Sequence, residues 1–170
     1  MDSVSEDLKR ASIRFQSVEA RAVFAPEFNE QVARTNSKGV LLSAATLKLV
    51  RRAVDRHHEN NEDALIVCDK HGGRNRYDDV ISKAFDDDFV FRLEEGRAKS
   101  VYRLGALQFC FRTKAEELLP VAVASMVAKY VRELVMMQFN AFWKKHLPDL
   151  KSTKGYPQDA KRFWLSLIHI

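Results

Sequence analysis

The chain has 170 residues, a net charge of +5 and two cysteines. This length suits one domain with a real core and is too short for two. Apolar residues make up 46% and charged residues 30%, as in ordinary globular proteins. There is no apolar run of about 18 residues to span a membrane, and the polar N-terminus lacks a signal region. We therefore expect a cytoplasmic monomer without membrane association, whose basic surplus permits a polyanionic partner.

The first third of the chain predicts a helix, a strand and a second helix. Residues 5–15 suit a short helix. Residues 17–24 alternate as a strand does and end before Pro26. Residues 43–56 have the apolar spacing of a helix, with Ser43 as its N-cap.

The remainder of the chain predicts a sheet followed by a long helix. An uninterrupted apolar run at 64–68, ended by Asp69, indicates a buried central strand. A helix over 78–85 and three strands follow, and the strands lie at 89–94, 100–105 and 107–112. The longest helix follows Pro120 and reaches about His146, and one of its faces is predicted to be buried: Val123, Val127, Val131, Leu134, Phe139 and Phe142. A loop and a last helix occupy 149–164. This order of elements predicts an α/β layer fold.

Two further expectations concern the cysteines and the end of the chain. Cys68 and Cys110 lie in apolar runs, which favours free thiols over a disulfide. Residues 165–170 resemble a peptide produced when sequencing-adapter DNA is translated in frame. We expect this segment to be a non-native tail after a single domain of residues 1–164. A genuine C-terminal strand is the alternative.

Asp69 is the first candidate for chemistry, because it ends the predicted central strand. Sites in α/β sheets form at the carboxyl ends of strands, and a carboxylate there can anchor a divalent metal. Gly72 and Gly73 would let a phosphate backbone approach, and Arg74 could contact it. The alternative is that Asp69 caps the next turn and that the glycines only turn the chain.

Glu116 supplies a second hard oxygen donor near the end of the last predicted strand. Two carboxylates suit Mg²⁺ or Mn²⁺ rather than zinc. Hydrolysis of phosphodiesters commonly uses two such ions. From the residues alone, an exposed glutamate beside Glu117 is the simpler interpretation.

The long helix and the turn after it carry candidates for nucleic-acid contact. Ser125 belongs to a stretch of small residues that permits close packing. Lys129 and Arg132 are three residues apart and share a face that could meet phosphates, although a solvated basic face is the commoner meaning of such a pair. Tyr156 follows Lys154 and a glycine on a turn, where its ring could stack on a sugar or base or pack on the domain.

Three stretches, taken in order, resemble the type 2 ribonucleases H. They are Lys114-Ala115-Glu116, the helical segment 124–133 with sequence ASMVAKYVRE, and Lys154-Gly155-Tyr156. The family has a Lys-Ala-Asp element, a helix beginning Ala-Ser-Ile-Ile-Ala-Lys-Val-x-Arg-Asp, and a Lys-Gly-Tyr turn, in this order and at similar spacing. The resemblance covers residues 18–164 and is firm after about residue 110.

This resemblance implies a ribonuclease H-like mixed sheet with flanking helices. It also implies a metal-dependent endonuclease that cleaves the RNA strand of RNA–DNA hybrids by a two-metal mechanism with Mg²⁺ or Mn²⁺. Asp69 would be the third of four metal-binding acids, and Glu116, in place of the usual aspartate, the fourth. Tyr156 would contact the 2′-hydroxyl that distinguishes RNA from DNA. The other expected nucleic-acid contacts are Gly72, Gly73, Arg74, Ser125, Lys129, Arg132 and Lys154.

The family's N-terminal Asp-Glu-x-Gly-Arg-Gly strand, which carries its first two acids, has no counterpart in this sequence. On this resemblance the chain begins after the first strands, as a fragment would, and we expect little cleavage from it alone. A non-catalytic nucleic-acid-binding module with the same fold is the alternative. A third hypothesis is a domain with neither property.

Overall fold

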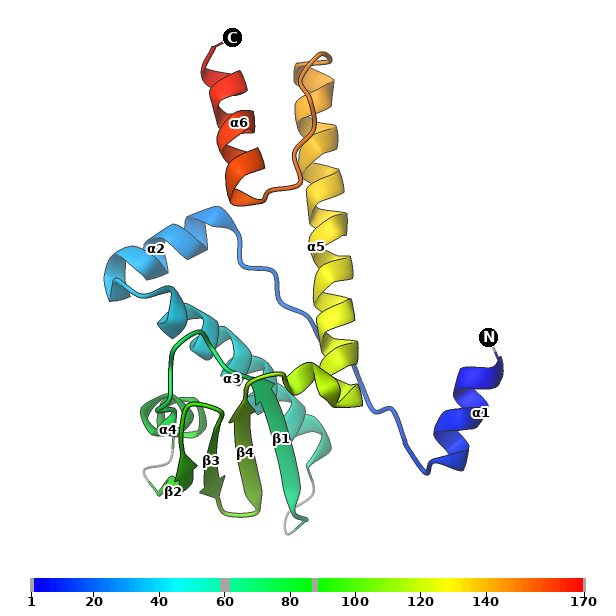
Figure 1. Ribbon diagram of the computed structural model, residues 1–170, viewed down its shortest axis with the longest axis vertical. Helices are drawn as coiled ribbons and strands as arrows, with labels where there is room; N and C mark the ends of the chain where they lie inside the picture. The colour runs from blue at the N-terminus through cyan, green and yellow to red at the C-terminus, as the bar shows by residue number, and fades with distance from the viewer. Residues whose placement is uncertain (1, 59–61, 87–88, 170) are drawn as a thin grey trace. The chain divides into compact units, whose positions relative to one another are not determined.

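The computed structural model describes residues 2–58, 62–86 and 89–169 and divides into two compact units (Figure 1). Unit 1 is Met1–Val121 and unit 2 is Ala122–Ile170. All described strands belong to unit 1. Unit 2 holds most of helix α5 (Leu119–His146) together with helix α6 (Pro157–Ile168). The single domain over 1–164 stays a prediction.

A mixed sheet of four strands organises unit 1, in the order β1-β4-β3-β2. Strands β2, β3 and β4 form an antiparallel meander, and β1 pairs with β4 in parallel. This arrangement confirms the predicted α/β class with a mixed sheet. The strands are β1 (Ala64–Asp69), β2 (Phe91–Glu95), β3 (Lys99–Leu104) and β4 (Leu107–Arg112).

Helices α3 and α4 lie against one face of this sheet (Figure 1). Leu47 from α3 and Ile81 from α4 are fully buried against aromatic side chains of β3 and β4. This packing encloses the core of unit 1 between two layers. The helices of the unit are α1 (Asp2–Arg10), α2 (Ala25–Thr35), α3 (Lys38–His57) and α4 (Asp78–Phe85), with a short 3-10 turn η1 (Ala115–Glu117) after β4.

Two buried tyrosines tie the loop before α4 to the sheet. The Tyr77 ring stacks on Phe111, with 3.7 Å between the ring centroids. The Tyr102 hydroxyl accepts a hydrogen bond from the Tyr77 backbone N–H at 3.1 Å and donates one to Glu95 Oε1 at 2.6 Å. Burial, with help from Glu95, raises the pKa of Tyr102, so the hydroxyl stays protonated and able to donate.

The predicted strand over 17–24 is wrong, because this segment has no regular secondary structure and pairs with no described strand. Its polar residues instead lie along the end of α3. Ser17 Oγ is 2.9 Å from His57 Nε2, and Glu19 accepts a hydrogen bond from Arg56. The alternation of small apolar residues was therefore misleading, since β-propensity depends on a partner strand being in reach.

The structure also corrects the predicted helix over 43–56 and the predicted central strand over 64–68. The second predicted helix is α3, which begins at Lys38 with Ser37 as its N-cap, so Ser43 is an interior residue and is buried. The predicted central strand is β1, which lies at one end of the order of the described strands. Leu65 on β1 is 64% exposed, so the apolar run does not mark burial on both faces. The predicted helix over 78–85 and the three later strands are confirmed within two residues.

Unit 2 departs from its prediction in the burial of α5. The helix has the expected length, but none of its residues is buried, and Leu134, Phe139 and Phe142 are exposed. The well-packed part is an aromatic cluster in which Phe163 of α6 contacts Phe139 and Trp143. No described helix combines the length and the apolar character required to cross a bilayer.

The cysteines and the end of the chain complete the comparison with the sequence. Cys68 and Cys110 are free thiols, as expected, and burial raises the pKa of Cys68 to about 12. Residues 165–168 continue α6, so the alternative of a C-terminal strand is wrong for them. Ile170 lies outside the described residues. The non-native origin of this segment stays a prediction.

The Tyr102 hydroxyl provides a test of the core. We expect Tyr102→Phe to lower the free energy of unfolding by about 1–3 kcal/mol, because the buried Tyr77 N–H loses its acceptor. Urea denaturation measures this change. Tyr130→Phe is the matched control, since Tyr130 is exposed. Equal stability of the two variants would show that the hydroxyl network contributes nothing to stability.

Candidate metal and nucleic-acid site

The structure brings Asp69 and Glu116 to the same edge of the sheet, the one at which the carboxyl ends of β1 and β4 lie. Asp69, the last residue of β1, is in register with Arg112, the last residue of β4. Because these strands are parallel, their carboxyl ends coincide, and η1 begins three residues beyond β4. The Ala115 backbone N–H donates a long hydrogen bond of 3.5 Å to Asp69 Oδ1. Asp69 therefore contacts the start of η1, a turn 46 residues further along the chain and not the turn that directly follows β1.

Glu116 and Glu117 differ in their partners. Arg112 donates to Glu117 Oε2 at 3.0 Å, which neutralises that carboxylate. Glu116 is exposed and has no ion-pair partner among the described residues. Glu116 is thus the member of the pair that is available to a cation.

Two carboxylates can hold one Mg²⁺ ion that keeps several waters and takes further ligands from substrate phosphates. A two-ion centre needs more donors. In residues 2–58, 62–86 and 89–169, no three side chains of His, Cys, Asp or Glu are grouped so that they could hold a metal ion. This edge therefore offers Asp69 and Glu116 as hard oxygen donors, the kind of ligand that Mg²⁺ prefers.

The loop that follows β1 is fixed by its own side chains rather than left open. Lys70 Nζ donates to Asn75 Oδ1 at 3.0 Å and to Ser100 Oγ at 3.1 Å. The His71 backbone N–H donates to the Tyr77 hydroxyl at 3.0 Å. Gly72 has φ +62°, a left-handed conformation that favours glycine, and no heavy atom lies within 4 Å of a Cβ built there. These contacts hold the predicted contact residues Gly72, Gly73 and Arg74 in a defined turn.

His71 is a residue to which the sequence assigned no role. Its ring is buried, 2.9 Å from Ser43 Oγ through Nδ1, and its edges meet Tyr77 and Phe111. Burial lowers the pKa of His71, Arg74 lowers it further, and Asp69 opposes them. The only signal in the sequence was its place two residues after a strand, because its partner Ser43 is 28 residues away.

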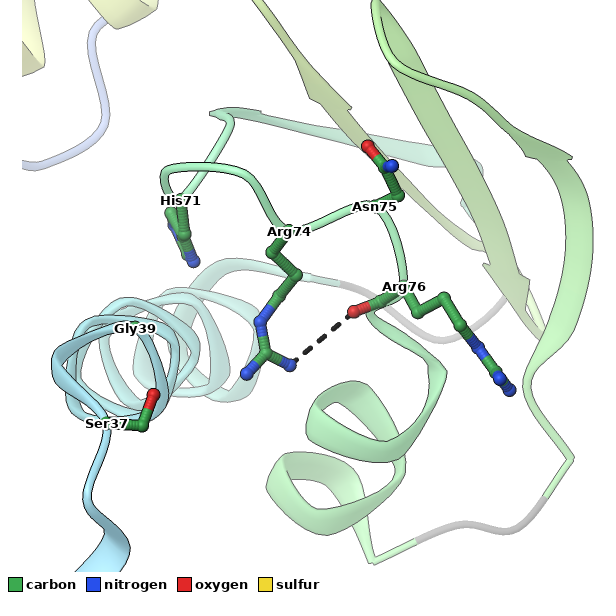
Figure 2. A pocket seen from close by; sticks show the side chains of 6 residues that line it. All are labelled: Ser37, Gly39, His71, Arg74, Asn75 and Arg76. Atoms are coloured by element: carbon green, nitrogen blue, oxygen red, sulfur yellow. Dashed lines mark hydrogen bonds between the residues drawn. The ribbon is translucent and has the colours of Figure 1, made fainter.

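Beside this loop lies a cavity of about 480 Å³ (Figure 2). The Arg74 side chain points into it, and the Arg76 side chain points away. Arg76 is paired with Asp78 at 3.2 Å, whereas Arg74 has no carboxylate partner among the described residues. Arg74 is therefore the uncompensated positive charge of the cavity. Its lining residues are Ser37, Gly39, His71, Arg74, Asn75 and Arg76.

Unit 2 gathers three of the predicted nucleic-acid contacts into one cluster. The Arg132 guanidinium carbon lies 4.4 Å from the centroid of the Tyr156 ring, and the same side chain donates to the Lys154 carbonyl. Tyr156 is still 58% exposed. Ser125 is half-buried and Lys129 exposed on α5.

The Lys-Gly-Tyr turn is shaped by residues that the resemblance did not include. Asp159 Oδ2 accepts hydrogen bonds from Thr153 Oγ1 at 2.7 Å and from the Lys154 N–H at 2.6 Å. These bonds, with one from Arg162, lower the pKa of Asp159 to about 2. Asn140 of α5 exchanges two hydrogen bonds with the Thr153 backbone. The turn is thereby fixed to both helices of unit 2.

No protein family, curated protein or solved structure matches the chain. The assignment of Asp69, Glu116 and the contact residues therefore rests on their chemistry and placement.

Substitution of Gly155 tests whether the Lys-Gly-Tyr turn requires a glycine at this position. It has φ +72°, and a Cβ there would lie 3.1 Å from Met136 Sδ. We expect Gly155→Ala to destabilise unit 2 by about 1–2 kcal/mol, through the left-handed conformation and the close contact. Amide hydrogen exchange of Lys154 and its neighbours would detect the loss locally.

Gly73→Ala is the control, because no heavy atom lies within 4 Å of a Cβ built there and its φ lies outside the left-handed region. If Gly155→Ala left exchange in the turn unchanged, the turn would not depend on this backbone conformation.

Proposed function

We propose that the chain is a ribonuclease H-type, metal-dependent endonuclease that acts on the RNA strand of RNA–DNA hybrids. The supporting observation is the placement of Asp69 and of Glu116, which has no ion-pair partner among the described residues, near the edge where parallel β1 and β4 both end. Such an edge is the usual place for a site in an α/β sheet. Its two hard oxygen donors suit Mg²⁺ or Mn²⁺.

We assign a role to each residue at this edge. Asp69 and Glu116 would hold the cation, which when bound activates water and stabilises charge on a phosphate. Asp69 is oriented by the Ala115 N–H, and Arg112 keeps Glu117 from competing. The turn carrying Gly72, Gly73 and Arg74 starts from the same edge, within reach of a phosphate backbone.

The cluster of unit 2 supports nucleic acid as the substrate class. Arg132 and Lys154 supply positive charge, and the exposed Tyr156 ring supplies a surface on which a base or sugar can stack. Tyr156 would also be the contact to the 2′-hydroxyl. Lys129 and Ser125 would add backbone contacts on α5.

Metal binding tests the proposal directly. We expect the chain to bind Mn²⁺, detected by electron paramagnetic resonance, and Asp69→Asn or Glu116→Gln to weaken binding at least about tenfold, because each removes one of two charged ligands. Glu117→Gln is the matched control, since Glu117 is already paired with Arg112. Equal Mn²⁺ affinity in all four proteins would refute the site.

Cleavage of a labelled RNA–DNA hybrid is the second readout of the same variants. Because two carboxylates are fewer ligands than a two-ion centre needs, we expect Mn²⁺ binding to be easier to detect than cleavage. Any metal-dependent cleavage should disappear in both Asp69→Asn and Glu116→Gln. Cleavage that survives both changes would place the active centre elsewhere.

A non-catalytic nucleic-acid-binding module is the second candidate, favoured by the absence of a third acid from the described metal-binding edge. It predicts salt-sensitive binding that is independent of the metal. We expect Lys129→Gln to lower the slope of log affinity against log salt by about one, because one phosphate contact is lost. Lys144→Gln, on the last turn of the same helix, is the control. Unchanged slopes in both variants would remove Lys129 from the interface.

A further inference from the structure

The cavity beside the loop after β1 is closed on one side by the start of α3, a helix of 20 residues. Ser37 Oγ accepts the Val40 N–H at 3.3 Å. The N–H groups of Lys38 and Gly39 have no acceptor in the described part of the chain. The first turn of α3 carries no acidic residue, so the positive end of its dipole is not compensated.

Arg74 adds a full positive charge to the same space. Arg74 is half-buried, and among the described residues its guanidinium makes a 3.5 Å hydrogen bond to the Arg76 carbonyl and a contact with the Tyr77 ring. None of the residues that line the cavity is acidic. An anion is the ligand that such a space favours.

His71 gives the cavity a more specific chemistry, because its hydrogen bonds fix its tautomer. Ser43 Oγ donates its only hydrogen to the Gly39 carbonyl at 2.8 Å, so it must accept from His71 Nδ1–H at 2.9 Å. Nε2 then carries a lone pair. The ring is only 8% exposed and is directed from the loop toward α3 (Figure 2). Nε2 has no hydrogen-bond partner among the described residues.

We infer that this cavity binds a phosphate monoester. Arg74 and the free N–H groups of Lys38 and Gly39 hold its charged oxygens, and His71 Nε2 accepts the hydrogen bond of the P–OH that a monoester monoanion retains. A phosphodiester has no P–OH and would place a bare oxygen against the lone pair. The site shares Arg74 with the proposed nucleic-acid contacts, but it goes beyond the proposed nuclease function because it uses neither Asp69 nor Glu116. A terminal phosphate of a nucleic-acid strand and a free nucleotide share the required chemistry.

The first experiment titrates the chain with inorganic phosphate at about pH 6.5, where one phosphate proton is partly retained. We expect saturable shifts of the Gly39 and Val40 amide signals in NMR spectra. Arg74→Gln should weaken binding at least about tenfold. Arg103→Gln is the control for charge, since Arg103 pairs with Asp63 at the opposite end of the sheet.

Gly39→Glu is a second variant that separates binding from folding. A Cβ at Gly39 meets only Ser37 Oγ, at 3.7 Å, so the side chain fits. An acid in the first turn complements the helix dipole, and therefore the fold should keep its stability while phosphate binding is lost. Absence of saturable binding to the wild type, or unchanged binding in both Arg74→Gln and Gly39→Glu, would overturn the site.

The nature of the ligand follows from three further titrations. Dimethyl phosphate should bind at least about tenfold more weakly than inorganic phosphate, because it leaves His71 Nε2 without a donor. Equal affinity would overturn the assignment to monoesters. If the natural ligand is the end of a nucleic-acid strand, a 5′-phosphorylated oligonucleotide should cause larger Gly39 shifts than its 5′-hydroxyl form. If the natural ligand is a free nucleotide, adenosine monophosphate should cause shifts as large as those of the phosphorylated oligonucleotide.

The metal-site variants keep this inference independent of the nuclease proposal. Asp69→Asn should leave phosphate binding intact or strengthen it, since it removes a negative charge near His71. Loss of Mn²⁺ binding with retained phosphate binding would support both sites. Retained Mn²⁺ binding in Asp69→Asn would count against the metal site alone.

Discussion

The parallel pairing of β1 with β4 is the constraint on which the candidate chemistry of unit 1 depends. It sets the carboxyl ends of two strands 43 residues apart in sequence beside each other, as the register of Asp69 with Arg112 shows. Everything that follows either strand then starts at one edge: the loop from Lys70 and the turn η1. A shift of one residue in this register would turn Asp69 toward the opposite face of the sheet and separate it from Ala115.

Much of this sheet could be predicted from local pattern. The alternation in β4 and the spacing of Leu47, Val50 and Val54 in α3 record burial on one side, which the structure confirms, whereas β3 has three consecutive buried residues. The sequence also placed Asp69 at a strand end and suggested Glu116. It could not show that Arg112 pairs with Glu117 and leaves Glu116 free of that ion pair, because this depends on where the Arg112 side chain goes.

The features that could not be predicted from the sequence depend on contacts between residues that are distant in the chain. Residues 17–24 look like a strand until one knows that α3 is their neighbour. Ser43 reads as a helix cap, yet it lies inside α3, which is capped by Ser37, and its hydroxyl contacts His71. The cavity at the start of α3 has no linear motif at all, since Gly39 and Arg74 are brought together only by the packing of α3 against the sheet.

The stacking of Arg132 on Tyr156 has a consequence for how unit 2 would respond to salt. The guanidinium holds the ring and the turn carbonyl at once, so under the proposed function the aromatic surface would already be oriented before a strand binds. The Tyr156 side chain would then lose little rotamer entropy on binding. Ionic strength should change how tightly a polyanion is held there, while the direction in which the ring faces stays the same.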